Sequence, residues 1–353
     1  MKVGILTQHF LCNYGGIIQN YALQQVLLRL GHKPLTFEHD TCFTWWRWFL
    51  RCAKNTIIRQ RLPEIPYRGR IGHHKFIDFI AKNICSVGVN HFTAHTHIKY
   101  GCDAYIVGSD QVWRPAFNIG ERLYNMFLDF VPEETRKIAY AASFGVSEWE
   151  YDEEQTSRCR QLAKRFSAIS VREESGITLC REHLGVDAIH VLDPTLLLEK
   201  EDYIKVCSDI PQSKPHLFVY VLGMTAELQR VVSEISETYG LNTEYIYTND
   251  KMKESDSIEK WFAHFRDADY IVTDSFHGMV FSIIFNKPFN VVMNHGGGFS
   301  RYESLLGMLG LTDRIVHNGV VKTDEINWNQ VTESLEPQRK KSISFITNNL
   351  KNE

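Results

Sequence analysis

Short apolar segments alternate with helical stripes along almost the whole chain, and this alternation limits the fold more than any other feature. Residues 2–7 (KVGILT) have the composition of a buried strand, and apolar residues then recur every four positions up to Gly31, which is typical of a helix. Strands are predicted on this basis at 2–7, 34–37, 104–107, 137–141, 168–171, 189–192, 217–222, 244–247, 270–273 and 289–293. Helices are predicted between and after them, for example at 153–166, 226–239, 257–266 and 328–350.

Strands that alternate with helices favour parallel sheets covered by helices on both faces. The chain has 353 residues, of which 44% are apolar, and this is long enough for two such units. We therefore predict an α/β protein of two doubly wound, Rossmann-like domains that face a cleft. The expected bounds are 1–185 for the first domain, with an insertion at about 43–75, then 186–325 for the second domain and 326–353 for a helix that packs back across the seam.

Charge, cysteine content and hydropathy exclude several classes of protein. The net charge is −3, so no overall positive field selects nucleic acid. The eight cysteines form no CxxC pair, which favours reduced, buried thiols. The opening MKVGILTQHF becomes polar too soon for a signal peptide, and no apolar run reaches membrane-spanning length. We expect a cytoplasmic protein.

Polar residues stand between two apolar runs in IVTDSFHGMVFSI, residues 271–283. The first run is the predicted strand at 270–273 and the second is helical, so Asp274 and Ser275 lie where a cap is needed and His277 lies in the first helical turn. Ligands bind beyond the carboxyl ends of parallel strands, and helix N-termini favour anions. His277 is therefore a candidate functional residue. The alternative is an ordinary cap followed by a core histidine.

Two other strand ends have similar residues. In YIVGSDQVW, residues 105–113, Ser109, Asp110 and Gln111 follow the predicted strand, although Gly-Ser-Asp is also good turn chemistry. In NYGGIIQNYALQ, residues 13–24, Gly15 and Gly16 precede a helix and allow a close backbone approach to a ligand.

Two arginines have positions suited to an anion. Arg172 follows the strand at 168–171, and Arg301 begins a helix after the glycines at 296–298. The guanidinium fork matches phosphate and carboxylate geometry. Each arginine can equally be a surface charge paired with a neighbouring glutamate.

The segment 45–75 is basic and rich in tryptophan, with Trp45, Trp46 and Trp48 among eight arginines and lysines and a single acidic residue, Glu64. As a helix it would have an apolar face opposite a basic one, which suits an anionic membrane surface. An ordinary insertion packed on the cleft is the other interpretation.

The ordered set of motifs resembles the polysaccharide pyruvyl transferase family. The matching stretches are NYGGIIQNYALQ, DAYIVGSDQVWRP, AYAASFG, ISVREESG, VLDPTLLL, DYIVTDSFHGMVFSIIFNKPF and SRYESLLGMLGL, in family order from residue 13 to 311. The resemblance implies a fold of the B-type glycosyltransferase class. It also implies transfer of a pyruvyl group from phosphoenolpyruvate to two hydroxyls of a sugar, as a ketal.

The resemblance also implies roles for particular residues. Arg172 and His277 match family positions that hold phosphoenolpyruvate. Many relatives have an arginine two residues before that histidine, where this chain has Ser275, and we expect Arg301 to replace it. The expected donor-binding residues are Arg172, Ser275, Phe276, His277, Gly278 and Arg301. The expected acceptor-binding residues are Asn13, Gly15, Gly16, Ser109, Asp110, Gln111 and Ser143.

The expected chemistry needs an acid near C3 of phosphoenolpyruvate and a base near the sugar hydroxyl. His277 is assigned one of these roles, and Asp110 or Asp274 orients or deprotonates the acceptor. We expect no cofactor, no metal ligands and no nucleic acid, and a sugar or lipid-linked oligosaccharide as acceptor. Two alternatives remain: a nucleotide-sugar glycosyltransferase of the same fold, and a non-catalytic glycan-binding protein.

Overall fold

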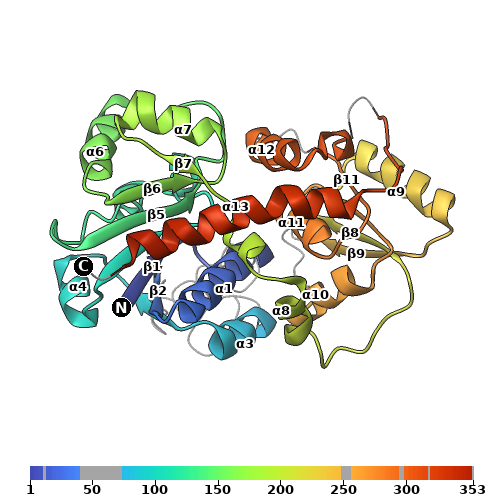
Figure 1. Cartoon of the computed structure of the whole chain (residues 1–353), viewed down its shortest axis with the longest axis horizontal. Coiled ribbons are helices and arrows are strands. Elements are labelled where there is room, and N and C mark those ends of the chain that lie inside the picture. The colour runs from blue at the N-terminus through green and yellow to red at the C-terminus, as the bar shows by residue number, and fades with distance from the viewer. Residues whose placement is uncertain (11–12, 40–73, 248–255, 294–297, 317–318, 352–353) are drawn as a thin grey trace, which may run out of the picture.

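Two parallel sheets form the framework of the protein. The computed structural model describes residues 1–10, 13–39, 74–247, 256–293, 298–316 and 319–351. The first sheet has seven strands in the order β3-β2-β1-β4-β5-β6-β7, and the second has four in the order β11-β10-β8-β9. All neighbouring strands run parallel, and helices cover both sheets (Figure 1).

The strands are β1 (Lys2–Leu6), β2 (Lys33–His39), β3 (Ser86–Val89), β4 (Ala104–Val107), β5 (Arg136–Ala142), β6 (Ala168–Val171), β7 (Ile189–His190), β8 (Leu217–Val221), β9 (Thr243–Tyr247), β10 (Tyr270–Thr273) and β11 (Phe289–Val291). The α-helices are α1 (Tyr14–Arg29), α3 (His74–Asn83), α4 (Ala94–Tyr100), α5 (Glu121–Asn125), α6 (Glu153–Ala163), α7 (Ser175–Leu179), α8 (Lys200–Val206), α9 (Ala226–Tyr239), α10 (Ile258–Asp267), α11 (Phe276–Ile284), α12 (Phe299–Leu309) and α13 (Trp328–Asn349). A 3₁₀ helix, η3 (Pro194–Leu197), follows β7.

Each predicted strand is present, and the alternation of strands and helices is confirmed. The sequence did not predict β3, because its four residues, SVGV, are few and include a glycine. The strand predicted at 189–192 ends at His190 and pairs with β6, so the first sheet extends past residue 185, the expected limit of the first domain.

Helix α1 is buried on nearly all sides, because it lies between the first sheet and the second domain. Its polar side chains therefore have internal partners. Gln19 donates to Thr7 Oγ1 at 2.8 Å, and Gln24 donates to Thr36 Oγ1 at 2.8 Å. At its start Tyr14 stacks on Trp261 of α10, with ring centroids 5.4 Å apart. The first turn of α1 is thus held against the second domain.

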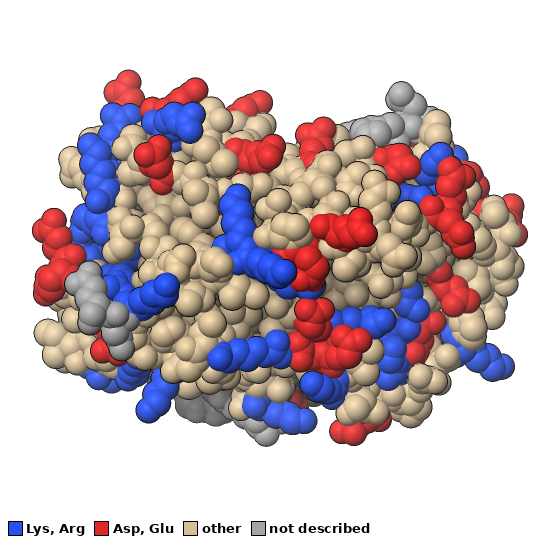
Figure 2. Space-filling model, viewed as in Figure 1, with Lys and Arg blue, Asp and Glu red and all other residues tan. Residues whose placement is uncertain are grey.

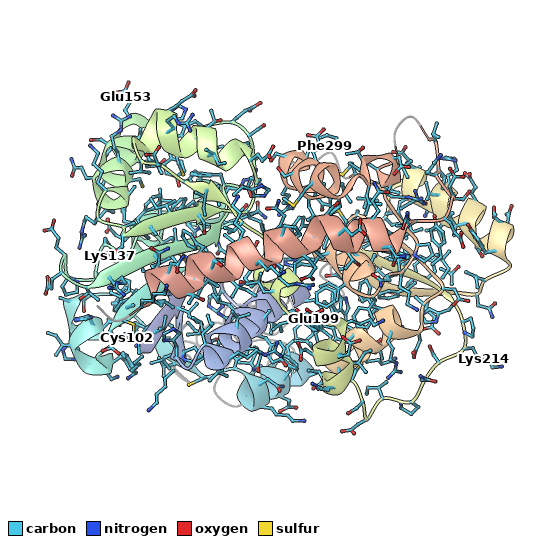
Figure 3. The ribbon with its side chains drawn as sticks, in the orientation of Figure 1. Cys102, Lys137, Glu153, Glu199, Lys214 and Phe299 are labelled. Carbon is cyan, nitrogen blue, oxygen red and sulfur yellow. The ribbon has the colours of Figure 1, made fainter. Side chains whose placement is uncertain are left out.

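Helix α13 extends along both domains (Figure 1). It packs against α12 of the second domain and against η3. Ser342 Oγ accepts a hydrogen bond from the backbone N–H of Leu192 at 3.0 Å, and Phe345 lies beside Tyr140 of β5 with ring centroids 6.2 Å apart. Arg339 pairs with Glu199, which is labelled in Figure 3, at 2.8 Å. These contacts join the C-terminal helix to both domains.

Basic and acidic side chains are interspersed on the face seen in Figure 2. Five cysteines in the described part of the chain are free thiols, and four of them, Cys102, Cys159, Cys180 and Cys207, are buried as expected, whereas Cys85 is exposed. A search of the described residues found no helix with the length and apolar character needed to cross a membrane. Nearly all of the basic, tryptophan-rich segment predicted at 45–75 lies outside the described residues.

Candidate active site

A cavity of about 250 Å³ lies where the two domains meet. The first domain contributes residues from the start of α1 and from the turn after β4, and the second contributes residues after β8, from the start of α11 and from α12. The lining residues are Asn13, Asp110, Gln111, Leu222, Ser275, Phe276, His277 and Arg301. All except Leu222 were predicted as site residues from the sequence. The structure therefore brings together side chains from five separate segments.

The start of α11 has the local structure that its sequence predicts. The β-branched strand β10 is fully buried and ends at Thr273. Ser275 is the N-cap, and its hydroxyl accepts a hydrogen bond from the backbone N–H of Gly278 at 3.4 Å. The first-turn N–H groups of a helix lack intrahelical acceptors and favour an anion. His277 thus lies in the first turn, at the cavity.

The ring of His277 is held between the two domains. Its Nδ1 faces Gly15 of α1, where an added Cβ would lie only 2.0 Å from that nitrogen. Its Nε2 is buried without a hydrogen-bond partner, 3.8 Å from Asp193 Oδ2, which is ion-pair range but too long for a hydrogen bond. Gly15 is therefore a glycine because the imidazole occupies the space of a side chain.

Asp193 was not predicted from the sequence, although it follows the predicted strand at 189–192 within VLDPTLLL. It is fully buried in the crossover between the domains, and its Oδ1 accepts hydrogen bonds from the backbone N–H and hydroxyl of Thr195 at 3.0 and 2.8 Å. Burial acts to raise the pKa of Asp193, but His277, Arg172 and Thr195 outweigh it and hold the pKa well below its usual range. Asp193 is therefore an anion beside His277.

Arg172 is buried behind the cavity and does not line it. Its Nη1 donates to Asp193 at 3.0 Å and its Nη2 to Asp110 at 3.3 Å, while its guanidinium carbon lies 4.7 Å from the centroid of the Phe276 ring. Burial acts to lower the pKa of Arg172, but the two aspartates raise it above its usual value. In this arrangement Arg172 positions both aspartates and supports the ring of Phe276.

Asp110 lies at the cavity in an uncommon backbone conformation, with φ of 80°. Its Oδ1 accepts hydrogen bonds from the backbone N–H of Gln111 at 2.9 Å and from Arg172. Its Oδ2 is on the side of Gly16, 3.8 Å from where a Cβ of that residue would lie. Strained conformations of this kind are concentrated at functional sites. The geometry leaves Oδ2 as the oxygen that can accept a proton from a bound molecule.

Arg301 is the cation that lines the cavity. Its guanidinium carbon is 5.5 Å from the ring centroids of Phe276 and Tyr302, and its Nε is buried without a hydrogen-bond partner. Gly298 makes room for it, since a Cβ there would be 3.1 Å from the guanidinium. No carboxylate of the described residues forms an ion pair with Arg301. Arg301 is therefore a cation at the cavity that no carboxylate of these residues neutralises.

Several predicted site residues have structural contacts and do not line the cavity. The carboxylate of Asp274 accepts hydrogen bonds from the backbone N–H groups of Leu222 and Gly223, at 2.6 and 3.1 Å, and burial raises its pKa despite them. Ser109 and Ser143 are completely buried, and Gly278 packs against Thr273. We therefore assign no catalytic role to Asp274 and no acceptor contact to Ser109 or Ser143.

A larger groove of about 980 Å³ shares the start of α12 with the cavity. Polar and apolar side chains both line it, among them Glu174, Phe299 (labelled in Figure 3), Ser304 and Lys341. These residues come from both domains and from α13. A small cavity lined by both Arg301 and Asp110 thus lies beside a wider groove.

A comparison with protein families identifies the family of this chain. A sequence model described as polysaccharide pyruvyl transferase matches residues 13–296, which is most of the chain and includes every cavity-lining residue except Arg301. The chain belongs to the polysaccharide pyruvyl transferase family. No curated protein matches the sequence.

Solved structures show which fold this pyruvyl transferase family member has. It is similar to the UDP-GlcNAc 2-epimerase of Methanocaldococcus jannaschii in complex with UDP-GlcNAc and UDP, with 12% identity, a TM-score of 0.50 and 99% of each chain covered. It is also similar to Arabidopsis thaliana UGT89C1 complexed with UDP-L-rhamnose, with 10% identity, a TM-score of 0.50 and 98% of each chain covered. The shared feature is the fold, the B-type glycosyltransferase arrangement of two Rossmann-like domains.

Proposed function

We propose that the protein transfers a pyruvyl group from phosphoenolpyruvate to two hydroxyls of a sugar and releases inorganic phosphate. The observation that carries this proposal is the cavity itself. Its volume of about 250 Å³ is below the range of roughly 300–1,000 Å³ typical of pockets for drug-sized ligands. It has a cation without an ion pair among the described residues, Arg301, and the start of α11. A small molecule with a phosphate and a carboxylate matches these features.

His277 and Asp193 form the acid–base unit of this proposal. Asp193 lies beside Nε2, so we assign the proton exchange with the substrate to Nδ1, the nitrogen that faces Gly15 at the start of α1. A proton delivered to C3 of phosphoenolpyruvate converts its methylene to a methyl group and leaves an oxocarbenium-like C2. Arg301 and the α11 N-terminus hold the phosphate and the carboxylate during this step.

Asp110 acts on the acceptor. A sugar hydroxyl attacks C2, and its proton passes to Asp110 Oδ2. The bond between C2 and the phosphate oxygen then breaks, phosphate leaves, and a second hydroxyl of the same sugar attacks C2 and loses its proton. The products are a pyruvate ketal and inorganic phosphate, so no oxidant or reductant is consumed. The groove beside α12 is the proposed place of the rest of the acceptor.

The test is an incubation with phosphoenolpyruvate and a panel of lipid-linked and nucleotide-linked sugars. We expect a product whose mass exceeds that of the acceptor by pyruvate less one water, together with one inorganic phosphate per product. A nucleotide-sugar glycosyltransferase would instead release a nucleoside diphosphate from its donor. A glycan-binding protein would bind the panel without turnover. Either result would contradict the proposed pyruvyl transfer.

We propose in addition that the acceptor is lipid-linked and that the segment 45–75 associates with anionic lipid. Each basic residue near such a surface contributes on the order of 1 kcal/mol, so the association should be reversible and sensitive to salt. The protein should co-sediment with anionic vesicles at low salt and dissociate at high salt, and the triple variant Arg47→Glu, Arg51→Glu, Lys54→Glu should not bind. Equal sedimentation of the variant and the wild type would exclude this role for the segment.

A further inference from the structure

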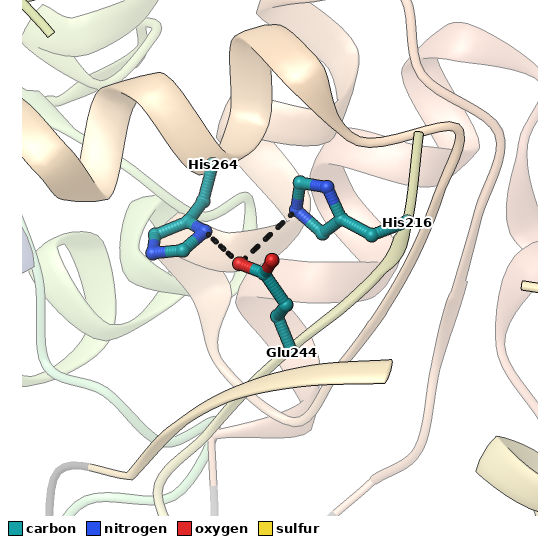
Figure 4. A group of neighbouring side chains, drawn as sticks. All are labelled: His216, Glu244 and His264. Atoms are coloured by element: carbon teal, nitrogen blue, oxygen red, sulfur yellow. Dashed lines mark ion pairs between the residues drawn. The ribbon is translucent and has the colours of Figure 1, made fainter. Parts of the chain in front are cut away.

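Three side chains from separate elements of the second domain meet at one point (Figure 4). His216 immediately precedes β8, Glu244 belongs to β9, and His264 belongs to α10. Their ligand atoms all lie within 4.8 Å of one another. His264 Nδ1 is 3.0 Å and His216 Nε2 is 3.8 Å from the same carboxylate oxygen, Oε2 of Glu244. Both histidines are at least nine-tenths buried, whereas Glu244 is 43% exposed.

Hydrogen bonds on the far side of each ring determine where its proton lies. His216 Nδ1 is 2.9 Å from the carbonyl oxygen of Lys214, which can only accept, so Nδ1 carries a proton. His264 Nε2 is 3.0 Å from Asp256 Oδ2, and it likewise donates. The ring of His264 is also stacked on Phe218, with centroids 4.8 Å apart and planes inclined by 10°. Both rings therefore have fixed orientations.

If each ring carries only the proton already assigned, the remaining nitrogens, His216 Nε2 and His264 Nδ1, both face Glu244 with lone pairs. His216 Nε2 is buried and has no hydrogen-bond partner. A lone pair on His264 Nδ1 would stand 3.0 Å from a carboxylate oxygen, which is repulsive unless a proton or a metal ion lies between them. A second proton on His264 would satisfy that one contact but would leave the buried Nε2 of His216 unpaired.

We propose that His216, Glu244 and His264 bind a divalent transition-metal ion of the zinc class. Two imidazoles and a carboxylate select such ions over magnesium or calcium, which prefer oxygen ligands. In a tetrahedral site with metal–ligand bonds of about 2.0–2.2 Å, neighbouring ligand atoms lie roughly 3.4 Å apart. The observed distances from Glu244 Oε2, 3.0 Å to His264 Nδ1 and 3.8 Å to His216 Nε2, lie on either side of this value. Asp256 behind His264 supplies the carboxylate–histidine arrangement that orients metal ligands. The exposed side of Glu244 leaves the fourth position to water.

The position of the cluster indicates a structural role. It lies at the amino end of β8, while Leu222, beyond the carboxyl end, lines the cavity. Six residue steps along β8 separate His216 from Leu222, a distance of about 20 Å. Asp256 also accepts a hydrogen bond from the hydroxyl of Tyr14 through its backbone oxygen, at 2.7 Å. An ion here would join β8, β9 and α10 and so support the contact of α10 with the first domain. This inference is independent of the proposed transfer reaction.

The test uses the full chain, stripped with a chelator and then titrated with Co²⁺ and with Zn²⁺. We expect one equivalent of Co²⁺ to give the intense visible bands of a tetrahedral site, Zn²⁺ to displace it, and Zn²⁺ to raise the Tm. His216→Ala and Glu244→Gln should lose the bands and the Tm increase. Asp256→Asn, which leaves all three proposed ligands in place, should weaken binding about 10–100-fold. His95→Ala, at an exposed histidine of α4, is the matched control and should bind as the wild type does.

Glu244→Gln is the deciding variant, because a half-exposed glutamate can be replaced without disturbing the core. If the wild type shows no bands, or if Glu244→Gln keeps them, the three residues do not form a metal site. The cluster would then be an ion-pair network in which a doubly protonated His264 bridges Glu244 and Asp256.

Discussion

Gly15→Ala is the most direct test of the His277 geometry, because it adds one methyl group from the opposite domain. The new Cβ would lie 2.0 Å from His277 Nδ1 and 2.5 Å from its Cε1, far inside contact distance. Gly16, one residue later, is the matched control, since its nearest neighbours would be 3.8 Å away. Both glycines are in the first turn of α1, so the two variants change helix propensity in a similar way.

The expected magnitudes follow from this difference. Alanine in place of glycine stabilises a helix by up to about 1 kcal/mol, so Gly16→Ala should be as stable as the wild type or more stable. Overpacking in a filled core costs about 1–3 kcal/mol. That range is the expected difference in unfolding free energy between the two alanine variants, since the propensity gain cancels. If the ring moves aside, the difference in stability will be small, but His277 will no longer be in place.

The assay is release of inorganic phosphate from phosphoenolpyruvate with a working acceptor, alongside thermal unfolding of each variant. Loss of a positioned acid or base lowers turnover by about 10²–10⁴-fold, and we expect Gly15→Ala to lose activity on that scale. Gly16→Ala should retain much more activity than Gly15→Ala. A Gly15→Ala protein with wild-type Tm and wild-type turnover would refute both the contact and the role of the ring.

Three further changes test other parts of the site. His277→Gln should lower turnover about 10²–10⁴-fold with an unchanged far-UV circular dichroism spectrum, and near-normal turnover would remove the imidazole from the chemistry. Arg301→Ala should weaken phosphoenolpyruvate binding in calorimetry roughly 10–100-fold, equivalent to a charged hydrogen bond of about 1.5–3 kcal/mol, and an unchanged Kd would show that Arg301 does not hold the donor. Burial raises the pKa of Glu173, so the folded protein binds this proton more tightly than the unfolded chain does. The stability of the fold therefore falls as the pH rises from the pKa of Glu173 in the unfolded chain to its pKa in the folded protein. Glu173→Gln should therefore have a higher Tm than the wild type at pH 7, with the advantage lost below about pH 4, the usual range of a glutamate; a constant difference across this range would contradict the pKa shift.

The positions of the strands and of the main site residues could be predicted from the sequence, because both depend on local pattern. Buried strands such as β10 are short and β-branched, and the polar residues after them reach the same edge of a parallel sheet. This reasoning, applied to two domains that face a cleft, was sufficient to bring Asp110 and His277 together, although they are far apart in the chain. Arg301 was expected beside them from the family resemblance.

Local pattern cannot show which partner a polar side chain has. Asp274 and Asp193 both follow strands, yet Asp274 accepts hydrogen bonds from the backbone of the next loop while Asp193 lies beside His277. The choice between them depends on tertiary contacts that no spacing encodes. The same holds for His216 and His264, which have 47 residues between them in the sequence and meet only because β8 and α10 are neighbours.

The attachment of α13 has a mechanical consequence. This helix has 22 residues and is about 33 Å long, and it is attached to the interdomain crossover at Leu192, next to Asp193. Because α13 also packs on α12 of the second domain, a rotation of one domain against the other would strain this attachment. We expect such a rotation to change the distance between Asp193 and His277. We therefore expect removal of α13 to loosen the alignment of Asp193 with His277, even though no residue of the cavity would be altered.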